Sequence, residues 1–176
     1  MLDKKINKQI LLFISGFIVR ILYLFFIKGF NADVHGDEGG YLLLADFILG
    51  RAPEGYFIFR APLAGFIFSP FFWVFGSSAQ LARMVNVIIS SLYAPLIYKI
   101  LSHKLKDDKV SYLLSYFWVF FPPSIFYASM ITSETLSGLL ILLLSLLIIR
   151  SENKINYKNL FVLAIICGLI SLTRSS

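Results

Sequence analysis

Long apolar runs separated by short polar stretches form the main pattern of this chain. A helix needs about 20 mostly apolar residues to span a bilayer. Runs 10–27, 81–100 and 110–130 have about this length, and the last contains two adjacent prolines. Runs 135–149 and 157–173 are somewhat shorter. We therefore expect an all-α integral membrane protein with about five transmembrane helices.

A further apolar run, 62–75, is short for a span and has Pro70 in its middle. If it does not span, the lysine-rich N-terminus, the 99–109 loop and the 150–158 loop all lie on one side, which the positive-inside rule makes cytoplasmic. We therefore expect 62–75 to lie along the outer surface, where its Phe residues and Trp73 suit an interfacial helix. The N-terminus is then an uncleaved cytoplasmic anchor, and the outer loop spans 29–80.

Composition supports a membrane location. Apolar residues make up 58% of the chain, Phe occurs 18 times, and mean hydropathy is +0.80, which excludes an ordinary soluble domain. The net charge of +6 comes from basic residues between apolar runs, as in cytoplasmic loops, so no nucleic-acid partner is expected. Cys167 is the only cysteine and excludes an internal disulfide.

The acidic pair Asp37-Glu38 follows the first apolar run, at the predicted exit from the membrane. Apolar residues after it recur at helical spacing as far as Gly50, so a short helix that lies on the membrane is expected to start near Asp37, the first of two interfacial helices in the outer loop. The helix dipole favours an ionised carboxylate there, and Tyr41 is one turn further along. Such a pair can bind a cation, accept a proton or pair with an arginine. An acidic helix start without a catalytic role is the alternative.

Basic residues at the same outer face are candidate anion ligands. Arg60 and Arg83 can each pair with a lipid phosphate, or can act as snorkelling anchors at the membrane edge. Arg20 differs because it lies in the middle of a span, where a charge costs roughly 2.5–3.5 kcal/mol. It should face the protein interior and have a partner there. Arg174 ends the last apolar run at the outer face.

Two other features at the outer face have open interpretations. Glu134 follows Thr132-Ser133, so it is either a residue in the first turn of a capped helix or part of an outer cavity shared with the acidic pair. His35 lies near three carboxylates and could ligate a metal ion. One histidine with flexible carboxylates is a weak metal signal, so no metal ligand is assigned, and a divalent metal stays an open alternative.

Several short motifs occur along nearly the whole chain in a fixed order. They are Asp37-Glu38-Gly-Gly-Tyr41, Arg60-Ala-Pro62 with its Phe-rich run to Phe75-Gly76, Ala82-Arg83-Met-Val-Asn86, Ser133-Glu134 after a proline-rich span, and Gly168 to Arg174. In this order they resemble the GT-C membrane glycosyltransferases, in the branch of protein O-mannosyltransferases and aminoarabinose transferases.

The resemblance implies transfer of a sugar from a polyprenyl-phosphate donor to an acceptor on the outer side of the membrane. It implies that Asp37 is the general base or orients the acceptor, with Glu38 beside it and Asp33 as the second choice. The leaving phosphate needs cations, which the resemblance assigns to arginines. The implied substrate-binding residues are Tyr41, Arg60, Arg83, Glu134 and Arg174.

Transferases of this kind are much longer, so residues 1–176 match the N-terminal part of the pattern. The expectation is a fragment, a truncated reading frame or half of a split enzyme, with a second chain that supplies the missing helices. Other expected partners are the lipid-linked donor and membrane lipids. The rival hypothesis is a non-catalytic membrane subunit, such as a transporter component or a scaffold. The acidic residues gather at one surface and no internal repeat is evident, which favours the transferase.

Overall fold

The computed structural model of the protein describes residues 2–53, 55, 60–105, 107–151 and 156–173, and all regular elements among them are helices. In chain order these are α1 (Leu2–Tyr23), the π-helical turn η1 (Leu24–Lys28), α2 (Asp37–Ile48), α3 (Pro62–Phe75), α4 (Ala79–Ser91), α5 (Tyr93–Lys104), α6 (Asp108–Val119), α7 (Pro122–Ala128), α8 (Glu134–Ser151) and α9 (Tyr157–Ser171).

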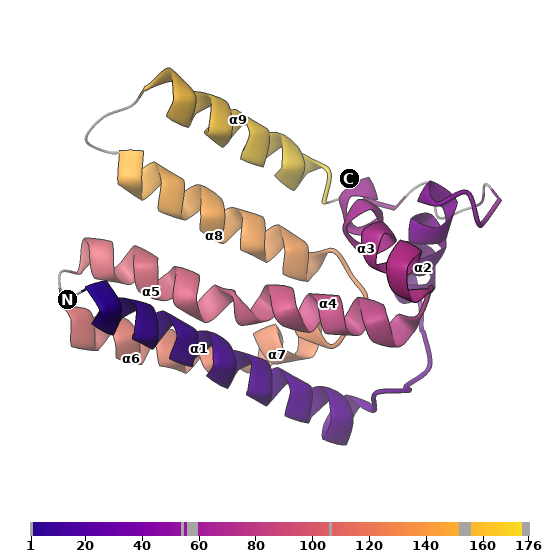
Figure 1. Ribbon diagram of the computed structural model, residues 1–176, viewed down its shortest axis with the longest axis horizontal. Helices are drawn as coiled ribbons and strands as arrows, with labels where there is room; N and C mark the ends of the chain where they lie inside the picture. Colours follow the sequence, from indigo (N-terminus) through magenta and orange to yellow (C-terminus); the bar gives the residue numbers. More distant parts are fainter. Residues whose placement is uncertain (1, 54, 56–59, 106, 152–155, 174–176) are drawn as a thin grey trace.

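The long helices run along one axis, and α2 and α3 sit together at one end of them (Figure 1). Helix α1 packs on α4 and α5, α5 packs on α6 and α8, and α9 lies along α8. The start of α1 and the turn between α5 and α6 lie at the opposite end from α2 and α3 (Figure 1). The Leu63 N–H donates to the Leu172 carbonyl at 3.1 Å, so the end of α9 meets the start of α3.

The described residues include three helical stretches that are long and apolar enough to cross a membrane: Lys5–Lys28, Ala79–Lys104 and Glu134–Ser151. Helices α3 and α9 are also apolar but shorter. Large apolar side chains such as Phe26, Trp73 and Phe117 are exposed on the outside of the bundle. This exposed apolar surface is consistent with a membrane protein. The elements of the described residues confirm the all-helical prediction.

The segment 110–130 is not the single continuous helix that we expected. It divides into α6 and α7, and Phe121 between them has an extended backbone. Pro122 and Pro123 lack an N–H, and a proline disfavours helical backbone in the residue before it. Prolines suit the first turn of a helix, so a new helix starts there. The break opens space beside α7.

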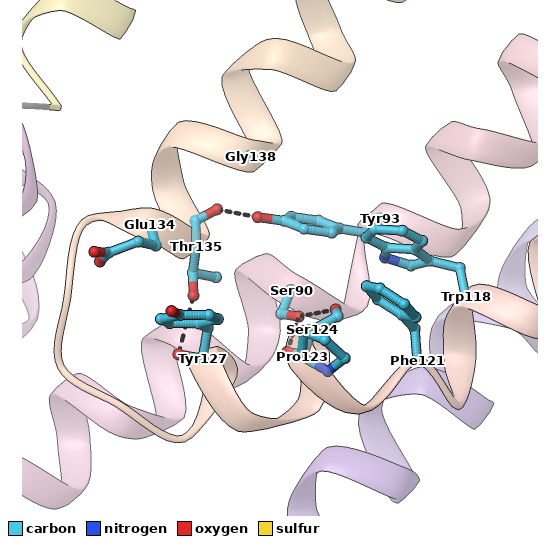
Figure 2. A pocket seen from close by; sticks show the side chains of 10 residues that line it. All are labelled: Ser90, Tyr93, Trp118, Phe121, Pro123, Ser124, Tyr127, Glu134, Thr135 and Gly138. Carbon is cyan, nitrogen blue, oxygen red and sulfur yellow. Dashed lines mark hydrogen bonds between the residues drawn. The ribbon is translucent and has the colours of Figure 1, made fainter.

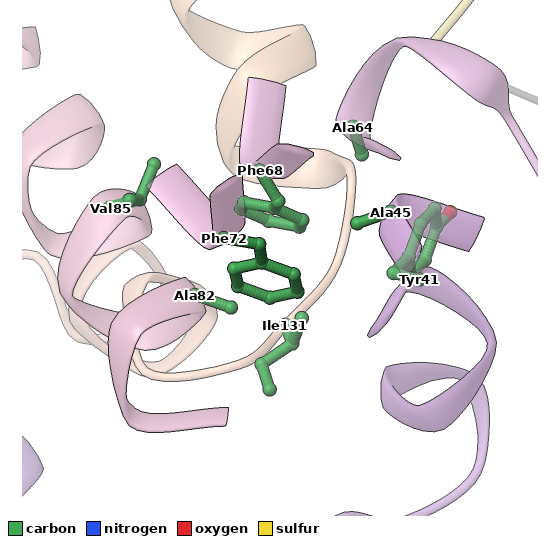
Figure 3. Close-up of a cluster of buried hydrophobic side chains, with 8 residues drawn as sticks. All are labelled: Tyr41, Ala45, Ala64, Phe68, Phe72, Ala82, Val85 and Ile131. Atoms are coloured by element: carbon green, nitrogen blue, oxygen red, sulfur yellow. The ribbon is translucent and has the colours of Figure 1, made fainter. Parts of the chain in front are cut away.

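The α2–α3 unit is fixed to the bundle by an apolar cluster (Figure 3). Phe68 and Phe72 of α3 are fully buried between α2, α4 and the turn before α8. Gly65 lets α3 approach α2 closely, because an added Cβ would lie 2.8 Å from Leu44 Cγ. The cluster consists of Tyr41, Ala45, Ala64, Phe68, Phe72, Ala82, Val85 and Ile131. It gives the start of α2 a rigid base.

At the opposite end of the bundle, Asp108 joins three helices. Its carboxylate forms an ion pair with Lys8 of α1 and accepts a hydrogen bond from the Tyr98 hydroxyl of α5 at 2.5 Å. The hydrogen bond from Lys8, followed by that from Tyr98, holds the pKa of Asp108 below its usual value. The Lys8 ammonium also lies 5.2 Å from the centre of the Tyr112 ring.

Candidate functional site

The acidic motif begins α2, as the sequence predicted. Gly36 precedes the helix with φ 55°, a backbone conformation that favours glycine. Asp37 and Glu38 occupy the first turn, where the helix dipole stabilises negative charge. Their environments are opposite. The Asp37 side chain is 63% exposed, whereas that of Glu38 is 1% exposed.

Asp37 is paired with Arg60 at the surface. An Asp37 carboxylate oxygen lies 2.6 Å from a terminal nitrogen of Arg60, whose side chain is 26% exposed. Gly40 makes this approach possible, because a Cβ at position 40 would lie 2.9 Å from Arg60 Nε. The second glycine of the motif therefore holds space for the arginine, and the pair remains open to a ligand.

Glu38 is buried and its two oxygens have separate partners. Oε1 accepts a hydrogen bond from the Ile131 N–H at 2.9 Å, and Oε2 accepts one from the His35 N–H at 3.2 Å. Oε2 also lies 3.6 Å from a terminal nitrogen of Arg83. A buried carboxylate needs this kind of compensation, so Glu38 connects the start of α2 to α4 and to the turn before α8.

Arg83 is completely buried and its terminal nitrogens are committed to the protein. They donate to three backbone carbonyls of the loop before α2, that of Ala32 at 2.8 Å and those of Phe30 and Asp33 at 3.2 Å. Arg83 Nε is buried without an acceptor among the described residues. This is neither a snorkelling position nor an exposed phosphate ligand. In this conformation Arg83 positions the acidic loop.

A second link runs from α2 to the turn before α8. The Tyr41 and Ser133 hydroxyls lie 3.0 Å apart, and both side chains are buried. Asn86 donates to the Met130 and Thr132 carbonyls at 2.7 and 3.3 Å, which fixes the same turn. The Ser133 side chain therefore bonds to the Tyr41 hydroxyl. From the sequence alone, Thr132-Ser133 is interpreted as a candidate cap of the following helix.

Glu134 is exposed and lies next to this link. It lines a cavity of about 380 Å³ together with Tyr127, Ser133 and Ser137. Its connection to the acidic motif runs through the neighbouring Ser133 and Tyr41. No ion pair of Glu134 occurs within the part of the chain that the structure describes.

The structure therefore brings most of the predicted residues to one end of the bundle. Asp37 pairs with Arg60 and Glu38 with Arg83, and Tyr41 bonds to Ser133, the residue before Glu134. Asp33 contributes its carbonyl to Arg83, and its side chain is exposed. Arg174 lies outside the described residues. Sequence reasoning missed the bond between Ser133 and Tyr41 and the space that Gly40 leaves for Arg60.

Metal binding has little support from the described residues, because no group of three or more His, Cys, Asp or Glu side chains lies close enough to hold an ion. Near the acidic pair, His35 contributes its backbone N–H to Glu38. The divalent metal that the sequence left open is therefore not assigned to any residue of this site.

Comparisons of the chain with protein-family models, with curated proteins and with solved structures find no match. A functional assignment therefore depends on the residues of the site and their arrangement.

Proposed function

We propose that this chain belongs to a membrane glycosyltransferase of the GT-C type, which moves a sugar from a polyprenyl-phosphate donor to an acceptor hydroxyl at the outer face of the membrane. One observation carries the proposal. An exposed carboxylate, Asp37, is paired at 2.6 Å with the accessible Arg60, while the adjacent Glu38–Arg83 pair is buried and fixes the start of α2. A carboxylate and a cation are the two groups that the reaction requires.

The proposed chemistry uses these two groups in turn. The donor phosphate takes over Arg60, which releases the Asp37 carboxylate. Asp37 then accepts the proton of the acceptor hydroxyl while the hydroxyl oxygen forms a bond to the anomeric carbon. The bond between that carbon and the phosphate oxygen breaks, and its electron pair leaves with the polyprenyl phosphate. Arg60 stabilises the charge that develops there.

The proposed topology has five spans, formed by α1, α4–α5, α6–α7, α8 and α9, with α2 and α3 on the outer surface. Its supports are the lysine-rich opposite end of the bundle and the exposed Trp73 and Phe75 at the end of α3.

This topology is testable in a Cys167→Ala background, which removes an exposed cysteine. In intact cells, a membrane-impermeant maleimide should label Val34→Cys in the acidic loop and should not label His103→Cys near the end of α5. Labelling at position 103 alone would reverse the orientation and would remove the site from the outer face.

The activity test compares two carboxylates of the same helix. Asp37→Asn should lower sugar transfer from a polyprenyl-phosphate donor by about 100-fold or more, the usual effect of losing a general base. Asp46→Asn is the matched control, because Asp46 also belongs to α2 but accepts a hydrogen bond from Ser77 instead of pairing with Arg60. Equal activities of the two variants would reassign the base, and the absence of transfer by the wild type would reject the function.

A further inference from the structure

A cavity of about 210 Å³ lies beside α7, where α4, α5, α6 and α8 meet (Figure 2). Four of its ten lining residues are aromatic: Tyr93, Trp118, Phe121 and Tyr127. The Trp118 and Phe121 rings stack with centres 4.7 Å apart, and Tyr93 lies 6.2 Å from Trp118. The helix break before Pro122 creates this space, because α7 starts in a new direction. The cavity therefore offers flat apolar faces to a ligand.

Two of the polar residues that line the cavity, Ser90 and Ser124, are both bonded to Arg20. Arg20 is 1% exposed and donates to each hydroxyl oxygen at 2.7 Å. Its other acceptors are the Gly16 and Val119 carbonyls, so no carboxylate of the described residues neutralises it.

This arrangement makes the two serines donors toward the cavity. An oxygen that accepts from a guanidinium is polarised, and its own proton remains available to another acceptor. The Ser90 hydroxyl oxygen lies 3.4 Å from the Ser124 carbonyl oxygen and 3.3 Å from the Ser124 hydroxyl oxygen, and both distances are long for hydroxyl hydrogen bonds. A ligand oxygen would be a better partner for both hydroxyls.

Trp118 supplies a third donor without a partner. Its indole Nε1 is buried and has no acceptor among the described residues, although the side chain lines the cavity. An unpaired buried N–H is costly, and such groups in folded proteins usually have a partner that explains them. An oxygen of a bound ligand would satisfy it.

At the mouth of the cavity Glu134 provides an acceptor. It lines both this cavity and the adjoining one of about 380 Å³, and the two also share Tyr127 and Gly138. Its carboxylate points away from the aromatic rings (Figure 2). The adjoining cavity includes Ser133, whose hydroxyl lies 3.0 Å from that of Tyr41 in the acidic motif. The two cavities thus extend from the aromatic side chains to Ser133, the hydrogen-bond partner of Tyr41 in the acidic motif.

We propose that the two adjoining cavities form a carbohydrate subsite that holds the sugar ring of the lipid-linked donor; this inference rests on the proposed function. A pyranose ring combines apolar C–H faces with hydroxyl groups on its rim. The aromatic rings pack against the faces, Ser90, Ser124 and Trp118 donate to the hydroxyl and ring oxygens of the sugar, and Glu134 accepts from its hydroxyls. An acyl chain would leave the donors unpaired, and Glu134 would repel a phosphate group.

The test uses the full chain in lipid nanodiscs and the fluorescence of Trp118. The chain has two tryptophans, so Trp73→Phe, a change at a residue 71% exposed on α3, leaves Trp118 as the only indole. The probes are short-chain prenyl phosphates that carry mannose, glucose, galactose or N-acetylglucosamine, and prenyl phosphate without a sugar. We expect at least one sugar-bearing probe to change Trp118 emission saturably, and the sugar-free probe to leave it unchanged.

A parallel measurement follows binding of the same radiolabelled probes without using fluorescence. Glu134→Gln should weaken binding of the sugar-bearing probe about tenfold or more, because hydrogen bonds to a charged acceptor are lost. Trp118→Phe keeps an aromatic face and should weaken it by a smaller factor. Ser145→Ala is the matched control on α8, where the hydroxyl donates to the Ile141 carbonyl of its own helix.

The outcomes separate the subsite from the function. If a sugar-bearing probe binds and is turned over while Trp118 emission and the affinity of Glu134→Gln are unchanged, the subsite is wrong and the proposed function stands. If the sugar-free probe gives the same emission change as the others, the cavity holds a lipid tail and the subsite is also wrong. If no sugar-bearing probe binds to the wild type, both proposals fail.

Discussion

Replacement of Arg83 by methionine removes the guanidinium from the centre of the buried network while keeping an unbranched side chain as far as the position of Nε. Three carbonyls of the loop before α2, those of Phe30, Ala32 and Asp33, would lose their donor. Glu38, which is 1% exposed, would keep its two backbone N–H partners but would have no cation beside it. The variant therefore leaves a charge and several acceptors uncompensated inside the protein.

The expected loss of stability is large. Removal of one partner of a buried ion pair costs about 3–5 kcal/mol, because the other charge remains buried. For a chain of this size such a loss lowers the unfolding midpoint by about 6–20 °C. In the double variant Arg83→Met/Glu38→Gln the amide is neutral and needs no cation, and its oxygen keeps one of the two backbone N–H groups that donate to Glu38. We expect the double variant to recover at least about 1 kcal/mol relative to Arg83→Met alone.

Thermal unfolding of the purified protein in detergent, followed by size-exclusion chromatography, measures these changes. Arg51→Met is the matched control, because Arg51 is exposed and its side chain donates one hydrogen bond among the described residues, to the Phe72 carbonyl at 3.0 Å. Its loss should cost less than about 1.5 kcal/mol. The positioning role of Arg83 would be refuted if Arg83→Met were as stable as Arg51→Met, or if Glu38→Gln failed to recover any stability in the double variant.

Three further outcomes follow from the contacts at the two ends of the bundle. Gly40→Ala should displace Arg60 and lower sugar transfer about tenfold or more with little change in the unfolding midpoint, as activity and thermal assays would show. Gly65→Ala should instead lower stability by about 1–3 kcal/mol, because the added Cβ crowds the facing side chain on α2. Because its folded pKa is lowered, ionised Asp108 stabilises the protein above the unfolded pKa of about 4, and this contribution disappears as pH falls through the folded pKa. The stability advantage of wild type over Asp108→Asn, measured by unfolding from pH 7 to 3, should therefore shrink in that acidic range, and a constant difference would contradict the role of the Lys8 contact.

Much of the helical layout follows from the hydrophobic pattern. The apolar runs other than 110–130, the helix that begins at Asp37 and the helix over 62–75 agree with the structure, because periodicity and the length of each run determine them. Pro122 and Pro123 also indicate the break between α6 and α7. The prediction of one continuous helix gave more weight to the length of the apolar run than to these prolines.

The division of labour within the acidic motif was not predictable from the sequence. Asp37 and Glu38 are neighbours in the chain, yet consecutive helical residues point about 100° apart, so one faces solvent and the other the core. Which residue is buried depends on contacts with Arg83 and Ile131, which are distant in sequence. The sequence likewise predicted Arg83 to be a cation at the membrane edge, because its partners in the loop before α2 are distant in sequence.

Equilibrium binding of a radiolabelled polyprenyl-phosphate sugar to the full chain in nanodiscs examines the proposed site without knowledge of the acceptor. If Arg60 holds the donor phosphate, the wild type binds the lipid saturably and Arg60→Gln binds it at least about tenfold more weakly, with an unfolding midpoint close to that of the wild type. Wild-type binding no greater than that of empty nanodiscs, or equal affinities of the two proteins, would contradict a donor site at the Asp37–Arg60 pair.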